Sequence, residues 1–131
     1  MQALFLKQTD FTPLVNFDLL TEKFEIKGES RPENTGKFYA QLTQWLEDLK
    51  KEVATNSLEK QLVFDFKFDY FNSTSAKYIL DLLAILQEIN NPLNKVNITV
   101  RWHYDKLDED MRESGEEFSH LVSLPFEFIV H

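Results

Sequence analysis

Residues 62–70 read LVFDFKFDY, a run in which apolar and polar side chains alternate from Phe64 onward. This period of two is typical of a β-strand, and it places on one face Leu62, Phe64, Phe66, Phe68 and Tyr70. Residues 96–104, VNITVRWHY, repeat the pattern. Each strand therefore has one apolar and one polar face. This predicts a sheet that helices cover mainly on one side.

A helix is predicted between these two strands, over residues 75–90. Its apolar positions recur at helical spacing and are Ile79, Leu82, Leu83, Leu86 and Ile89. Pro92 follows at once and cannot continue a helix. Strand, helix and strand at these lengths predict a parallel βαβ unit with a right-handed crossover.

The rest of the chain extends this unit into one α/β domain. A helix over residues 35–53 has the apolar stripe Phe38, Leu42, Trp45, Leu46, Leu49 and Val53, with Asn34 or Thr35 as its N-cap. A third helix is expected over residues 108–122, where Gly115 should weaken its middle. Short strands are expected at 14–17, 24–27 and 126–130. No linker or repeat divides residues 1–131.

Composition narrows the class of partner. The 131 residues carry 22 acidic and 14 basic side chains, a formal net charge of −8, and no cysteine. This balance argues against nucleic acid and against anionic membranes, both of which are bound through Lys and Arg. The first residues resemble no signal peptide, and no apolar run is long enough for a membrane span. We expect a soluble cytoplasmic protein.

Motifs for catalysis or cofactor binding are missing. His103, His120 and His131 have no HxxxH or HxH neighbour, so we expect structural roles and no metal. The glycines are isolated and form neither a Walker A loop nor GxGxxG. In the acidic run from Asp105, an EF-hand would need Gly at the sixth position, which is Asp110. A solvated helix face explains that run better, and we expect no cofactor.

Four small polar residues, Asn72, Ser73, Thr74 and Ser75, lie between the clearest strand and the clearest helix. One interpretation is structural, since such side chains cap the free N–H groups of a helix. The other is functional, because hydroxyls after a parallel strand lie where α/β folds bind ligands. A phosphate there would add a charge of about −1.5 to −2, which the helix dipole tolerates and a partner would sense.

Short motifs around this turn occur in a characteristic order. They are TP at 12–13, GESRPEN at 28–34, Phe38 and Trp45, YFNSTS at 70–75, WHYD at 102–105 with Asp108 and Glu109, GEEF at 115–118, and PF at 125–126. In this combination the chain resembles the SiaC family of regulatory phosphoproteins, whose fold is similar to the STAS domain of anti-sigma factor antagonists. The resemblance covers nearly the whole chain and implies a single STAS-like domain.

The resemblance also implies a function. Proteins of this family are non-enzymatic switches that a serine/threonine kinase phosphorylates and a metal-dependent phosphatase resets. The unphosphorylated form binds and activates a diguanylate cyclase, and so controls cyclic di-GMP and biofilm or aggregation behaviour.

The family's acceptor is usually a threonine in an Asn-Thr-Ser-Ser run, and here the aligned residue is Ser73, with Thr74 as the alternative. Arg31 stands where the family more often has tyrosine. Partner contacts are expected at Asn72, Ser75, Glu33, Asn34 and Tyr104.

Two other functions are compatible with the residues. A STAS-type antagonist would use the same turn to bind an anti-sigma kinase. A small hydrolase, from a different class of protein, would use the acidic helix together with His103. Identifying the protein that binds the chain, a cyclase or an anti-sigma factor, distinguishes a cyclase activator from the first alternative. A fitting cleft with a bound metal, or turnover that is lost in His103→Ala, would support the second.

Overall fold

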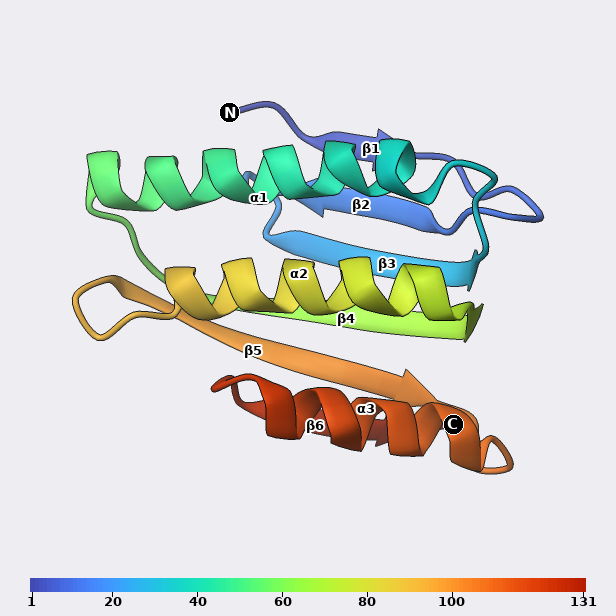
Figure 1. Ribbon diagram of the computed structural model, residues 1–131. Coiled ribbons are helices and arrows are strands. Elements are labelled where there is room, and N and C mark those ends of the chain that lie inside the picture. The colour runs from blue at the N-terminus through green and yellow to red at the C-terminus, as the bar shows by residue number, and fades with distance from the viewer.

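The computed structural model describes residues 1–131 as six strands and three helices (Figure 1). In chain order the elements are β1 Leu4–Leu6, β2 Leu14–Asp18, β3 Lys23–Ser30, α1 Thr35–Asn56, β4 Glu59–Phe71, α2 Ser73–Ile89, β5 Lys95–Tyr104, α3 Glu109–Leu121 and β6 Phe126–Val130. All the predicted elements are present. The short strand β1 was not predicted from the sequence, because three residues are too few to show a period.

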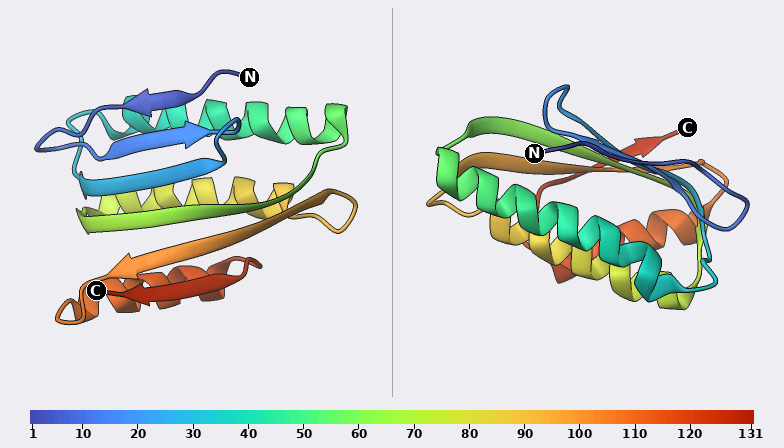
Figure 2. Two further views of the ribbon diagram at one scale, coloured as in Figure 1. Left: turned by 180° about the vertical axis from the view of Figure 1, so that it is seen from behind. Right: turned by 90° about the horizontal axis from the view of Figure 1, so that it is seen from above.

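The strands form one mixed sheet in the order β1-β2-β3-β4-β5-β6. The first three are antiparallel neighbours, whereas β3, β4, β5 and β6 are mutually parallel. A helix makes each parallel crossover, and all three helices cover the same face of the sheet (Figure 2). The predicted mixed sheet with helices on one face is therefore confirmed.

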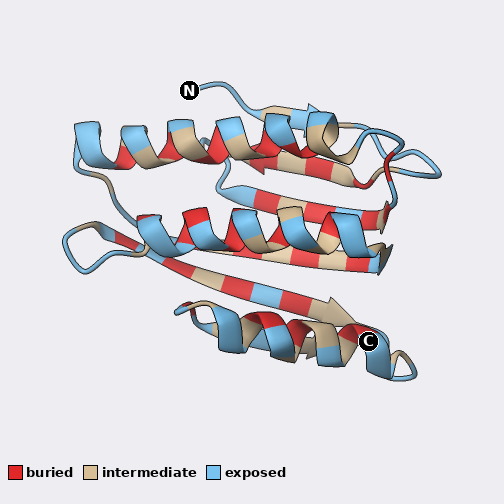
Figure 3. Cartoon of the chain, viewed as in Figure 1, coloured by how far each residue is buried: buried red, intermediate tan, exposed pale blue.

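A single hydrophobic core fills the space between the sheet and the helices (Figure 3). Aromatic rings from neighbouring strands line it: Phe24 stacks on Phe64 at 4.4 Å between centroids, and Phe66 stacks on Trp102 at 5.9 Å. Burial of these rings contributes most of the driving force for folding. The opposite face of the sheet is left to polar side chains.

The predicted stripe of α1 is correct except at its first member. Tyr39 is fully buried, and Phe38 is only half-buried. Tyr39 precedes Leu42 by three residues and Leu46 by seven, so it continues the buried stripe more directly than Phe38 does.

The end of β4 differs from the predicted alternation. The β3–β4 register passes from Gly28 opposite Phe68 to Glu29 opposite Tyr70, so Asp69 is an extra residue. Such a bulge inverts the faces that follow it. Tyr70, predicted for the apolar face, is half-exposed, and Phe71 returns to the core against Trp102 and Phe118.

Gly115 of α3 has a packing role in addition to its cost in helix propensity. A Cβ added at this position would lie 2.3 Å from Cδ1 of the buried Trp102 indole. The indole also donates from Nε1 to the carbonyl of Met111, at 2.9 Å. Only glycine lets α3 approach the sheet this closely.

Three buried hydroxyls join α1, β3 and α2. The Tyr39 hydroxyl lies 2.5 Å from Ser30 Oγ, which donates to Ser75 Oγ at 2.9 Å. Ser75 Oγ in turn donates to the Ser30 carbonyl at 3.0 Å. Burial raises the pKa of Tyr39 to about 12, although its bonds to the two serines act in the opposite direction. The hydroxyl group therefore stays neutral at physiological pH.

Replacing Gly115 with Ala should destabilise the fold. The added methyl group overlaps the Trp102 ring, at a cost of about 1–3 kcal/mol that exceeds the gain in helix propensity of up to about 1 kcal/mol. Thermal unfolding followed by circular dichroism should show a transition several degrees lower. Gly36→Ala is the matched control, because its Cβ would meet only the movable end of Tyr78. Equal transitions in the two variants would contradict the role given to Gly115.

Replacing Tyr39 with Phe should cost about 1 kcal/mol of unfolding free energy at pH 7, the value of one hydrogen bond. A tyrosine whose pKa is higher in the folded chain than in the unfolded chain stabilises the fold at pH values below its unfolded pKa of about 10. That contribution is lost as the pH rises toward 12, and over this interval the wild type should lose about 2–3 kcal/mol more than the variant. Urea denaturation at a series of alkaline pH values measures this difference. Parallel stability curves for the two proteins would contradict it.

Candidate functional site

The carboxyl ends of the four parallel strands lie at one end of the sheet, which we call the carboxyl edge, and each helix begins near it (Figure 1). The turn of residues 72–75 lies on this edge between β4 and α2. Its position is fixed from β3, because Asn72 donates its backbone N–H to the Ser30 carbonyl at 3.1 Å.

The turn is itself the start of α2. Asn72 is the N-cap, and its side chain accepts a hydrogen bond from the Ser75 N–H at 2.8 Å. The structural interpretation of Asn72 as a cap is therefore confirmed, and the helix begins two residues before the predicted start at residue 75. Asn34 and Asp108 cap α1 and α3 in the same way.

The hydroxyls of this turn differ in exposure. Ser73 and Thr74 are exposed, whereas Ser75 is fully buried among the three joined hydroxyls. Our expectation that Ser75 contacts a partner needs correction, because its side chain lies beneath the surface and bonds within the chain. Ser75 instead anchors the turn that presents its two neighbours. Ser73 and Thr74 are therefore open to solvent in the first turn of α2.

Ser73 and Thr74 share the charge surroundings of the first turn of α2. The first turn of α2 contains no acidic residue, so the positive end of its dipole is not neutralised there. Lys77 is exposed and lies one helical turn after Ser73. Thr74 lies three residues before the same lysine, so Lys77 is a neighbour of both hydroxyls on the helix surface. A negative group is therefore accommodated at either hydroxyl.

The other expected contact residues also lie at this edge. Glu33 and Asn34 are exposed in the loop that leads from β3 into α1, where the Asn34 side chain caps the helix. Tyr104 is the last residue of β5 and is half-buried. The fold thus gathers Glu33, Asn34, Ser73 and Tyr104 along one edge from three separate parts of the chain.

Apolar side chains that we did not single out from the sequence are exposed at the same edge. They include Phe11, Tyr70 and Leu107. Phe11 is held by Arg31, whose guanidinium lies 4.7 Å from the ring centroid and whose backbone N–H donates to the Phe11 carbonyl. Exposed apolar groups beside hydroxyls are typical of a surface that binds another protein.

The histidines are less isolated than their spacing suggests. His103 Nε2 lies 2.7 Å from Asp65 Oδ1, and its Nδ1 lies 2.8 Å from His131 Nε2. Asp65 lies in β4, His103 in β5 and His131 directly after β6, so no local motif reveals the contacts. They lie on the open face of the sheet, opposite the face that α3 covers. The hollow beside His103 is lined by Asp69, Asp105 and His131 among others and by no residue of α3, so His103 and the acidic helix share no cleft.

The open face carries charged residues in matched positions. Lys67 Nζ lies 2.7 Å from Glu25 Oε2 on the neighbouring strand. Partial burial raises the pKa of Glu25, but Lys67, Lys23 and Lys27 lower it by more, so the net shift is downward. A face with paired charges suits exposure to water and offers no apolar patch to a partner.

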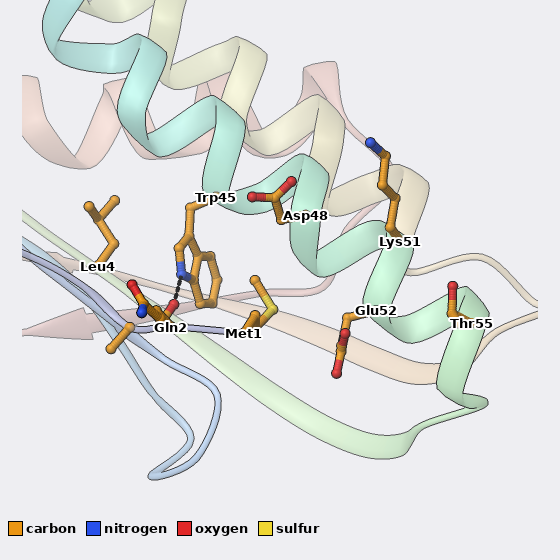
Figure 4. Close-up of a pocket in the computed structure, with 9 residues that line it drawn as sticks. Met1, Gln2, Leu4, Trp45, Asp48, Lys51, Glu52 and Thr55 are labelled. Atoms are coloured by element: carbon orange, nitrogen blue, oxygen red, sulfur yellow. Dashed lines mark hydrogen bonds between the residues drawn. The ribbon is translucent and has the colours of Figure 1, made fainter.

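A separate hollow lies between the N-terminal residues and α1 (Figure 4). It is lined by Met1, Gln2, Ala3, Leu4, Trp45, Asp48, Lys51, Glu52 and Thr55. The Trp45 indole donates to the Gln2 carbonyl at 2.8 Å and so ties the N-terminal segment to the helix. None of the predicted site residues lines this hollow. None of the three helices is long and apolar enough to cross a membrane.

The sequence matches the model of the SiaC family of regulatory phosphoproteins over residues 6–131. An uncharacterized protein of Pseudomonas aeruginosa strain UCBPP-PA14 is 30% identical over 131 residues, which cover all of this chain and 98% of that protein. The match thus extends over the strand edge and the turn of residues 72–75.

Solved structures agree with the sequence match. SiaC of Pseudomonas aeruginosa superposes with a TM-score of 0.84 at 28% identity, with both chains fully covered. A structure described as the diguanylate cyclase SiaD in complex with its activator SiaC matches with a TM-score of 0.85 at 30% identity, covering 98% of this chain and 99% of the other. Together with the fold and the capped, hydroxyl-bearing turn, these matches show that the chain belongs to the SiaC family of regulatory phosphoproteins.

Proposed function

We propose that this chain is a phosphorylation-controlled switch whose unphosphorylated form binds and activates a diguanylate cyclase. The observation that carries the proposal is the similarity, over nearly the whole chain, to a SiaC described as the activator in a complex with the cyclase SiaD. Such a protein regulates cyclic di-GMP in the cytoplasm, and through it biofilm formation or aggregation. It has no catalytic role of its own.

Ser73 is the phosphoacceptor in this proposal, with Thr74 as the alternative. Ser73 is exposed, lies on the unneutralised first turn of α2, and precedes Lys77 by one helical turn. A phosphate on its hydroxyl is accepted locally by the helix dipole and by Lys77. The buried anchor at Ser75 is untouched, so the fold changes little.

Phosphorylation then acts on the partner. The surface around Ser73 combines hydroxyls with the exposed apolar side chains of Phe11, Tyr70 and Leu107. A cyclase surface that packs against such a patch has no charge to pair with a phosphate. The added charge of about −1.5 to −2 introduces a desolvation cost and lowers the affinity. A serine/threonine kinase adds this charge, and a metal-dependent phosphatase removes it.

Phosphopeptide mapping tests the acceptor. The protein purified from its own cells, where the kinase is present, should carry a single phosphate on the peptide that spans residues 72–75, with Ser73 as the modified residue. Ser73→Ala should abolish that phosphate, and Ser123→Ala should leave it unchanged, since Ser123 is an exposed serine outside the turn. Phosphate only outside residues 72–75 would refute the proposed switch.

Cyclase binding and activity test the output. Ser73→Ala should bind the diguanylate cyclase and support cyclic di-GMP synthesis like the unmodified chain, whereas Ser73→Asp should bind at least about tenfold more weakly. Ser123→Asp adds the same charge elsewhere and should bind normally. Equal binding by Ser73→Ala and Ser73→Asp at unchanged stability would exclude gating by charge. If the chain binds an anti-sigma kinase in place of a cyclase, the turn belongs to a STAS-type antagonist.

A further inference from the structure

Strand β6 forms one edge of the sheet and pairs only with β5 (Figure 2). An edge strand exposes unpaired backbone groups, and proteins usually protect it by shortness, lysine or proline. The opposite edge strand, β1, has only three residues. By contrast β6 has five residues, FEFIV, with Glu127 as its single charge. The β6 edge is the unprotected one.

The hydrogen bonds between β5 and β6 show which backbone groups of β6 are unpaired. Pro125 accepts from Val100, and His131 both donates to Tyr104 and accepts from Lys106, so residues 125 and 131 point toward β5. Backbone direction alternates along a strand, so residues 127 and 129 also point inward. The N–H and C=O groups of Phe126, Phe128 and Val130 therefore face away from the sheet.

The side chains of the same three residues lie on the helix side of the sheet, where Phe128 aligns with Trp102 and Val130 with Tyr104. α3 does not cover them fully, because its buried residues pack on Trp102 and Phe71 instead. Phe128 is 38% exposed and Val130 is 55% exposed. Unpaired backbone and uncovered apolar side chains thus coincide on one strand edge.

We propose that this edge binds a second copy of the chain, with the two β6 strands antiparallel about a two-fold axis at Phe128. Phe128 then faces Phe128 of the second copy, and Phe126 faces Val130. Each of these pairs exchanges two backbone hydrogen bonds. The two sheets become one continuous sheet, and the exposed Phe128 and Val130 of each copy, with the half-buried Phe126, cover one another.

The positions of the charged residues favour this register and a second copy of the chain as the partner. Glu127 lies opposite Ile129 of the second copy, so no two like charges face each other. Glu127 also keeps its partner Arg101 within its own chain, at 3.4 Å. A two-fold pair closes on itself, whereas parallel pairing of the same strand would not. The formal charge of −8 on each copy opposes association at long range, so added salt should strengthen the dimer.

Disulfide trapping tests the register, because the natural chain contains no cysteine. In the unphosphorylated protein, Phe128→Cys places two sulfur-bearing residues directly opposite and should oxidise to a covalent dimer. Val130 is more exposed than Phe128, but in this arrangement residue 130 of one copy lies far from residue 130 of the other, so Val130→Cys is one control. Phe5→Cys is a second control, because Phe5 is 62% exposed and lies in β1 at the other edge of the sheet. Both should cross-link much more slowly. Equal rates for the three variants would overturn the pairing.

Sedimentation velocity of the cysteine-free chain gives a second measurement. The wild type should show a reversible monomer–dimer equilibrium in the micromolar range that salt shifts toward dimer. Phe128→Lys and Val130→Lys should be monomeric with an unchanged circular dichroism spectrum, while Phe5→Lys should dimerise like the wild type. A wild type that stays monomeric through the high micromolar range would refute the dimer. None of these outcomes depends on phosphorylation or on a cyclase.

Discussion

The hydrogen bonds at Ser30 are the constraint on which the candidate site depends. Its carbonyl accepts from the Asn72 N–H and from Ser75 Oγ, and its own hydroxyl lies between Tyr39 and Ser75. One residue at the end of β3 thereby fixes where β4 ends and where α2 begins. Because all these groups are buried, any shift of the first turn of α2 would leave a polar atom without a partner, at a cost of about 1–3 kcal/mol. The turn is consequently held still while Ser73 and Thr74 stay in solvent.

The one-sided sheet divides the molecule into surfaces with different uses. The helix face builds the core through ring contacts such as Phe24 on Phe64, and the open face pairs its charges, as in Glu25 with Lys67. The rim of the sheet carries the exposed groups that the two proposals use. The carboxyl edge carries hydroxyls and exposed apolar groups, and the β6 edge carries unpaired backbone. The two meet where Val130 pairs with Tyr104, but Ser73 follows β4, two strands away from β6, so a modification at Ser73 does not require a change along the β6 edge.

Much of this arrangement follows from periodicity, because local alternation in β4 and β5 decides both the strands and the side that the helices cover. The misses have physical causes. Tyr70 does not lie on the predicted apolar face because of the extra residue Asp69, whose position depends on the neighbouring strand. Gly115 appeared to be a weak point since its contact with Trp102 is tertiary. The pair His103 and His131, and the burial of Ser75, likewise arise from strands distant in sequence. Sequence could locate the turn, but could not separate its buried anchor from its exposed hydroxyls.

That separation explains how a small domain can combine a rigid fold with a modifiable surface. A hydroxyl that served both as helix cap and as phosphate acceptor would lose its hydrogen bonds on phosphorylation. The modification would then destabilise the start of the helix. Here Asn72 caps, Ser75 anchors, and Ser73 makes no hydrogen bond within the chain through its side chain. In the proposed switch, a charge added at Ser73 would therefore act at the surface, where a binding partner would meet it. A switch of this kind changes affinity without changing stability, and this suits a protein whose output is the activity of another.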